Sequence, residues 1–131
     1  MDVVYNYLLV GLGAFFGGIL RSWLGNRFNG GESVVYHGTF FANVLGCFFL
    51  GVLIGLTYKH MLVPSVELMA GVGFCGGLTT FSTFSLEVFR YFAEGRAQLG
   101  LAYWINTATT AITAAFLGII VVIGINGILH F

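Results

Sequence analysis

The run from residue 76 to 85, Gly-Gly-Leu-Thr-Thr-Phe-Ser-Thr-Phe-Ser, contains the densest polar chemistry in this sequence. It holds five hydroxyl side chains and two glycines inside an otherwise apolar stretch. Two interpretations stay open. The hydroxyls can bond to backbone carbonyls of their own or a neighbouring helix, as is common in membranes. Alternatively, Gly76 and Gly77 break the helix, so that freed carbonyls can hold a cation and freed amides can attract an anion.

Two aromatic residues within this run could contact an ion. Phe81, Phe84 and Glu87 are spaced by three residues and therefore share one face of a helix. An aromatic ring has a positive edge, which can face an anion in a dry passage. However, the chain has 14 phenylalanines, and such a pair on a membrane helix usually packs or faces lipid. From the residues alone, packing is the favoured interpretation.

Further polar residues interrupt the other apolar runs. Asn43 can join two helices or donate to an ion, and Arg21 can extend its charge to the membrane surface. In the last apolar run, four polar residues share one face of a helix: Asn106, Thr109, Thr110 and Thr113. Thr107 lies off this face. The four residues can either pack against another helix or line a pore. The three histidines are far apart, and no catalytic motif is present. We therefore do not expect an enzyme.

The composition indicates which elements position these residues. Charged residues make up 8% of the 131 residues and hydrophobic residues 58%, against about 25% charged in a typical soluble domain. This excludes an ordinary soluble protein, a disordered chain and a nucleic-acid binder, and it predicts an integral membrane protein. The apolar runs are continuous rather than alternating, so the predicted fold class is all-α.

The charged residues divide the chain into four predicted transmembrane helices within one domain, residues 1–131. Their expected bounds are residues 4–24, 38–58, 66–89 and 100–129. Glycines four residues apart, such as Gly13 and Gly17 or Gly51 and Gly55, predict close helix packing. Four such helices cannot enclose a wide pore alone, so we expect a homo-oligomer. Four arginines near the odd loops, against Lys59 on the other side, favour a cytoplasmic location of those loops.

The run from Gly76 to Ser85, followed by Glu87, resembles the signature of the Fluc/CrcB family of fluoride channels. Residues 17–21 (Gly-Gly-Ile-Leu-Arg) and 38–43 (Gly-Thr-Phe-Phe-Ala-Asn) match the family as well. The resemblance spans all four predicted helices. It implies passive, fluoride-selective export through the plasma or inner membrane by an antiparallel, dual-topology homodimer. Each dimer would have two pores, each built from both subunits.

The resemblance also implies roles for individual residues. Phe81 and Phe84 would meet fluoride edge-on, Asn43 would donate hydrogen bonds at the bottom of a vestibule, and Ser82 and Thr83 would form a polar track. Glu87 would belong to a hydrogen-bonded cluster near Asn43.

Three more assignments concern the dimer centre, the fourth helix and the first helix. The third helix would be broken near Gly76-Gly77, and carbonyls of Gly76 and Thr79 from both subunits would surround a structural Na⁺. A serine that the family usually has in the fourth helix is replaced by Ala111, which leaves Thr110 as the nearest hydroxyl for the pore. Arg21 would have a vestibule or structural role.

Two other functions remain open at this point. A small dual-topology multidrug transporter has a similar length, but it needs a membrane-embedded acid, usually in the first helix. This chain has only Asp2 at the start of that helix. A non-transporting membrane assembly subunit would explain the glycines, but it would not explain the polar interruption of the third helix.

Overall fold

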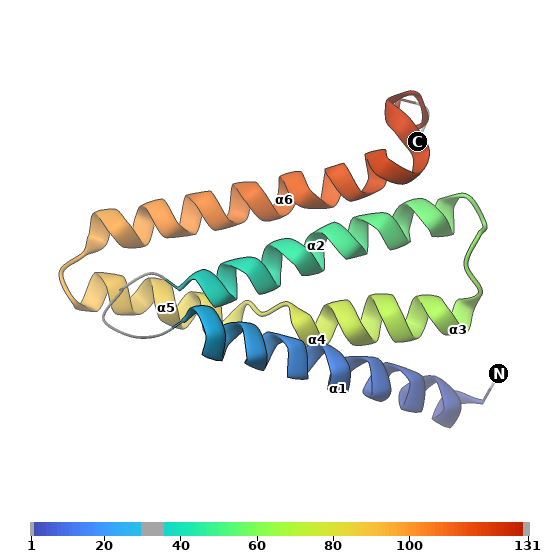
Figure 1. Ribbon diagram of the computed structural model, residues 1–131, viewed down its shortest axis with the longest axis horizontal. Coiled ribbons are helices and arrows are strands. Elements are labelled where there is room, and N and C mark those ends of the chain that lie inside the picture. The colour runs from blue at the N-terminus through green and yellow to red at the C-terminus, as the bar shows by residue number, and fades with distance from the viewer. Residues whose placement is uncertain (1, 30–35, 130–131) are drawn as a thin grey trace.

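The chain folds into four roughly parallel helical rods, one of which is interrupted (Figure 1). This computed structural model describes residues 2–29 and 36–129. The three continuous rods are α1 (Val3–Phe28), α2 (His37–Tyr58) and α6 (Ala97–Ile128). The interrupted rod consists of α3 (Pro64–Val66), the π-helix η1 (Glu67–Cys75), α4 (Gly76–Leu78) and α5 (Ser82–Ala93). The described residues contain no strand, which agrees with the all-α prediction.

The helix bounds follow local capping signals. Asp2 caps α1 by accepting a hydrogen bond from the Val4 N–H at 3.1 Å, and Pro64 occupies the first position of α3. At the end of α5, Gly95 has a φ of 76°, and its N–H and that of Arg96 bond back to the carbonyls of Phe92 and Tyr91. The first rod extends to Phe28, four residues beyond the predicted end at residue 24. Gly124, with a φ of 74°, kinks α6 near its end.

The interruption of the third rod begins two residues after Gly77. Gly76 and its neighbour Gly77 are helical, whereas Thr79 is extended, with a φ of −81° and a ψ of 154°. The third helix is therefore broken near Gly76-Gly77, as predicted, although the two glycines themselves are helical. Gly77 is needed for close packing, because a side chain there would collide with the backbone of Ala14 on α1. The Thr79 N–H still bonds to the Cys75 carbonyl at 3.0 Å, and the helical hydrogen bonds are lost from the Thr80 N–H onward.

Glycines bring the rods together, as their spacing predicted. Gly13 and Gly17 of α1 lie directly against the backbone of the interrupted rod, at the carbonyls of Met69 and Phe74. On the opposite side of the bundle, Gly51 of α2 lies against the backbone of Ala115 on α6. Helices that touch through their backbones gain van der Waals contact without any hydrophobic driving force. This packing fixes the interrupted rod against α1, and α2 against α6.

The outer surface is apolar. Large side chains such as Phe15, Phe16 and Trp23 are exposed, while the buried apolar cluster is small and lies near the interruption, at Leu24, Ala42 and Leu78. Among the residues that the structure describes, three helical segments are long and apolar enough to cross a membrane: Val3–Phe28, His37–Tyr58 and Ala97–Gly124. An exposed apolar surface of this extent is expected where lipid is the solvent. The protein is therefore a helical membrane protein.

Candidate functional site

The interruption of the third rod is bridged by one side chain of α2. Asn43 is buried, and its Oδ1 accepts a hydrogen bond from the Thr80 N–H at 2.7 Å while its Nδ2 donates to the Thr80 carbonyl at 3.0 Å. The amide thus replaces the helical partners that the Thr80 peptide group lacks. Sequence reasoning left helix joining and ion contact open for Asn43. The structure shows that Asn43 joins two helices. One of its two Nδ2 hydrogens is used for this, and the other remains for another acceptor.

Arg21 reaches the same interruption from α1. Its Nη1 donates a hydrogen bond to the Thr79 carbonyl at 3.2 Å. The Thr79 hydroxyl in turn donates to the carbonyl of Cys75 at 2.9 Å. The guanidinium is therefore directed at the broken backbone in the middle of the bundle, and its positive charge lies beside the proposed anion-contacting segment.

Phe81 and Phe84 have different surroundings although they are three residues apart. Phe81 precedes α5 as its N-cap residue and is 78% exposed, whereas Phe84 is 6% exposed. Their ring centroids are 6.3 Å apart, and Phe84 also packs against Tyr103 at 5.4 Å. Ser82 and Thr83 are exposed next to Phe81. One copy of the chain therefore leaves half of the predicted ion-contacting group uncovered.

Glu87 is the centre of a buried hydrogen-bonded cluster. Its Oε1 accepts from the Thr39 hydroxyl at 2.6 Å and from Asn29 Nδ2 at 3.4 Å, and its Oε2 accepts from the Tyr103 hydroxyl at 2.7 Å. Glu87 is only 3% exposed. Thr39 lies one turn before Asn43 on α2, so the cluster and the bridged interruption are neighbours. The helices α2, α5 and α6, together with Asn29 directly after α1, contribute to this cluster.

Three members of this cluster were missed by sequence reasoning. Thr39 lies in the matched run 38–43 but was not singled out, and Tyr103 stands alone in an apolar stretch. Asn29 follows the first rod, where a polar residue is ordinarily solvated. A buried carboxylate requires hydrogen-bond donors, and that requirement was the only available signal.

The threonine hydroxyls of α6 divide into those that bond within the helix and one, that of Thr107, which is buried. Those of Thr109 and Thr113 bond to the carbonyls of Ile105 and Thr109, and the Thr110 hydroxyl lies 3.3 Å from Asn106 Oδ1. These contacts stay within α6, as the packing interpretation expects. Thr107, which lies off the predicted face, is the buried hydroxyl, and it follows Tyr103 by one turn. Thr110 remains a predicted pore residue.

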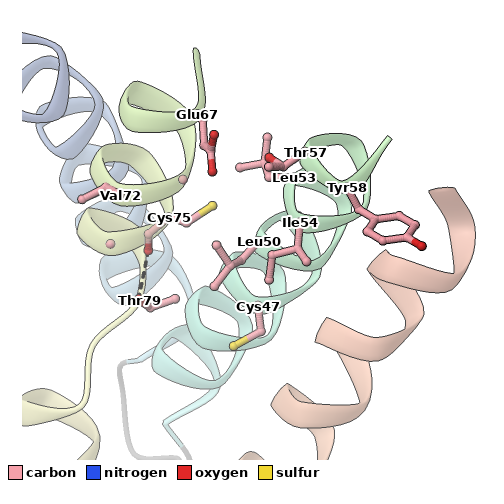
Figure 2. Close-up of a pocket in the computed structure, with 12 residues that line it drawn as sticks. Cys47, Leu50, Leu53, Ile54, Thr57, Tyr58, Glu67, Val72, Cys75 and Thr79 are labelled. Atoms are coloured by element: carbon pink, nitrogen blue, oxygen red, sulfur yellow. Dashed lines mark hydrogen bonds between the residues drawn. The ribbon is translucent and has the colours of Figure 1, made fainter. Parts of the chain in front are cut away.

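A polar cavity and an apolar groove adjoin the interruption. A polar cavity of about 470 Å³ is lined by residues of α1, α2 and the interrupted segment: Gly18, Arg21, Ser22, Gly25, Asn26, Asn29, Thr39, Thr80 and Thr83. A second, mostly apolar groove of about 620 Å³ separates α2 from η1 (Figure 2). Cys47 and Cys75 line it from its two sides, and Glu67 lies near one end.

The groove also contains the two residues predicted to hold Na⁺. Gly76 and Thr79 line its end nearest the interruption. The Thr80 N–H, which would continue the helix by bonding to the Gly76 carbonyl, bonds to Asn43 instead. Arg21 uses one side of the Thr79 carbonyl, which has a second lone pair. Carbonyl oxygens suit a hard cation, so these residues fit half of such a site. Within the described residues, histidine, cysteine and acidic side chains form no group that could hold a metal ion.

Long apolar helices around a rod with a polar, bridged interruption define an integral membrane protein with the architecture that channels and transporters use. Residues 8–119 match the family model described as "CrcB-like protein, Camphor Resistance (CrcB)". The chain therefore belongs to the CrcB-like family, as the resemblance indicated.

Named relatives extend this assignment. A "Fluoride-specific ion channel FluC" of Psychrobacter arcticus is 50% identical over 104 residues, which cover 73% of this chain and 80% of the relative. Proteins of the same name from Gloeothece citriformis and Serratia proteamaculans are 37% and 36% identical over 116 and 123 residues. These matches cover 88% and 93% of this chain and 94% and 97% of the relatives. The relatives are named as ion channels, and the family is not enzymatic. This confirms the prediction that the protein is not an enzyme.

Proposed function

We propose that this protein is a passive, fluoride-selective ion channel that exports fluoride across the cell's plasma or inner membrane. The observation that carries the proposal is the interruption at Thr79–Phe81, bridged by Asn43, in a chain that matches fluoride channels over most of its length. Four crossings would place this interruption at mid-membrane depth. Non-helical backbone at that depth is tolerated only where protein or water covers it.

The chemistry of the site suits a small, strongly hydrated anion. Fluoride in a narrow dry pore needs donors and positive edges to replace its water. Hydroxyls of Ser82 and Thr83, the amide of Asn43 and the ring edges of Phe81 and Phe84 can supply these without direct contact to a cation, which would trap the ion. The polar cavity beside Arg21 offers the anion a positively charged approach. Glu87 is compensated by three donors, which reduces its repulsion of the anion.

An antiparallel homodimer with two pores completes the proposal. The exposure of Phe81, Ser82 and Thr83 supports it, because a single chain cannot enclose a dehydrated ion with side chains that face outward. A second copy, inserted in the opposite direction, would cover this segment. Each pore would then be formed by residues of both copies.

We further propose a structural Na⁺ at the dimer centre, held by the carbonyls of Gly76 and Thr79 from both copies. When bound, the ion supplies a fixed positive charge that raises the electrostatic potential for anions nearby. The diverted Thr80 N–H supports this assignment, because it leaves the Gly76 carbonyl without its helical donor.

Fluoride efflux from liposomes tests the proposal and separates it from the two alternatives. Purified protein is reconstituted with internal fluoride, and release is followed with a fluoride electrode. A channel releases fluoride rapidly down its gradient and needs no proton or Na⁺ gradient. A requirement for such a gradient would indicate a transporter, and release equal to that of protein-free liposomes would indicate an assembly subunit.

A further inference from the structure

Asn29 caps a helix to which it does not belong. It ends α1, where its N–H bonds to the Gly25 carbonyl at 2.8 Å. Its side-chain Oδ1 accepts from the N–H of Gly38 at 2.6 Å and lies 3.4 Å from the N–H of Thr39. These are the second and third residues of α2, which an N-cap side chain ordinarily serves. Tyr36, the residue that precedes α2, makes no such bond, so Asn29 replaces it.

The other end of the same amide reaches the buried carboxylate. Asn29 Nδ2 donates to the Thr39 hydroxyl oxygen at 3.0 Å and to Glu87 Oε1 at 3.4 Å. An amide nitrogen can only donate, so the sense of both contacts is fixed once Oδ1 faces α2. One side chain therefore sets the start of α2 and the direction in which Glu87 points.

We propose that Asn29 is a positioning residue of the channel, which holds Glu87 against α2 and beside the polar cavity. This inference rests on the proposed channel function. Asn29, Thr39 and Tyr103 together provide donors to both oxygens of Glu87, so its negative charge stays compensated next to the anion path. Without the Asn29 donor, Oε1 keeps only the Thr39 hydroxyl, and the carboxylate is free to turn toward the cavity.

The groups around Glu87 allow a test by pH. Charged and titratable side chains that interact with it or its partners, or line the same cavity, come from each surrounding element: Arg90, Tyr91, Tyr103, Tyr36 and Arg21. All five are present in every variant, so their contributions cancel in comparisons.

The decisive variant is Asn29→Asp. Aspartate caps a helix as well as asparagine does, so the role of Asn29 at α2 is preserved. At Glu87, however, a donor becomes a second carboxylate. Two carboxylates in contact hold a shared proton at pH values where a single one is ionised. We expect a folded dimer whose fluoride flux at pH 8 is lower than the wild type by about tenfold, and which recovers most of that loss at pH 6.

Asn26→Asp is the matched control. Asn26 is exposed and lines the same cavity, about one turn before Asn29. Its replacement adds the same negative charge at a place that does not contact Glu87. The measured quantity is the ratio of flux at pH 6 to flux at pH 8, corrected with protein-free liposomes. We expect the wild-type ratio for Asn26→Asp and a several-fold higher ratio for Asn29→Asp. Equal ratios in the two variants would overturn the proposal.

A swap variant covers the case in which Asn29→Asp does not fold. Combining Asn29→Asp with Glu87→Gln restores one amide and one carboxylate with their places exchanged. We expect this double variant to fold and to show a flat pH ratio. If Asn29→Asp fails to fold and the swap does not restore folding, the proposal is wrong. Absence of flux in the wild type rejects the channel function instead, and the thermal stabilities of the same variants at pH 6 and 8 then test Asn29 separately.

Discussion

Phe81 and Phe84 differ in how much of each ring the folded chain covers, and this makes one of them the sharper probe. Phe81 is 78% exposed, so Phe81→Ile removes little packing within the chain. It does remove the positive ring edge. We predict that flux per dimer falls by about tenfold or more, since each 1.36 kcal/mol of added barrier corresponds to about tenfold in rate. Liposome flux and the thermal midpoint in detergent measure the two effects separately.

Phe84→Ile and Phe89→Ile complete the comparison. Phe84 is buried, so we expect its replacement to lower both flux and stability, the latter by up to about 1.5 kcal/mol. Phe89, 64% exposed on the same helix and outside the proposed pore, should keep normal flux. Normal flux in both Phe81→Ile and Phe84→Ile would remove the rings from the pore.

Tyr103→Phe tests the donors of Glu87. The substitution keeps the ring contacts with Phe84 and Tyr91 but removes the hydroxyl that donates to Glu87 Oε2. A buried carboxylate that loses a donor costs about 1.5–3 kcal/mol. We predict a loss of this size in the free energy of unfolding in detergent. Tyr7→Phe, at an exposed tyrosine of α1, is the control and should change little; equal losses in both would contradict the cluster.

At the scale of the elements, the contact between α1 and η1 depends on glycines without side chains. Gly13 lies against the Met69 carbonyl, whereas Gly11, on the same helix, has no atom within 4 Å of the position of an added Cβ. We predict that Gly13→Ala destabilises the protein by about 1–3 kcal/mol through overpacking. Gly11→Ala should be neutral or stabilising by up to about 1 kcal/mol, because alanine favours a helix. Unfolding in detergent compares them, and equal effects would show that the rods do not approach so closely.

The elements also show what sequence could and could not predict. Continuous apolar runs predicted the helices, and glycine spacing predicted their packing. The position of the interruption depends on Asn43, which is 37 residues away in sequence and supplies the hydrogen bonds that Thr80 loses from its helix. Gly76 and Gly77 marked the region but could not distinguish close packing from a break. Asn29 was missed because a polar residue after a helix looks solvated until its distant partners are known.

At the scale of the whole molecule, the charges are unevenly placed along the bundle. The ends of α1 and α5 lie together with the starts of α2 and α6, while the connection between α2 and α3 lies at the opposite end (Figure 1). Arg27, Arg90 and Arg96 therefore belong to one end and Lys59 to the other. This asymmetry favours a single orientation, whereas the proposed dimer requires both.

Labelling from one side of the membrane tests the orientation. Glu94 lies in the turn between α5 and α6, where its side chain is 55% exposed. We predict that an impermeant thiol reagent, applied outside intact cells, labels about half of the Glu94→Cys molecules, as antiparallel pairing requires. The wild type, with Cys47 and Cys75 in the helical rods, gives the background. Labelling of all molecules, or of none, would mean one orientation.

The central claim is that fluoride, and not a cation or chloride, carries passive current through this protein. The most direct measurement is the zero-current voltage of a planar bilayer containing the purified protein, with unequal NaF on the two sides and NaCl added so that the Na⁺ concentrations are equal. A fluoride-selective channel sets this voltage close to the value that fluoride's own gradient dictates, whereas chloride selectivity would reverse its sign and Na⁺ selectivity would bring it to zero. A voltage that follows chloride or Na⁺ would contradict the account.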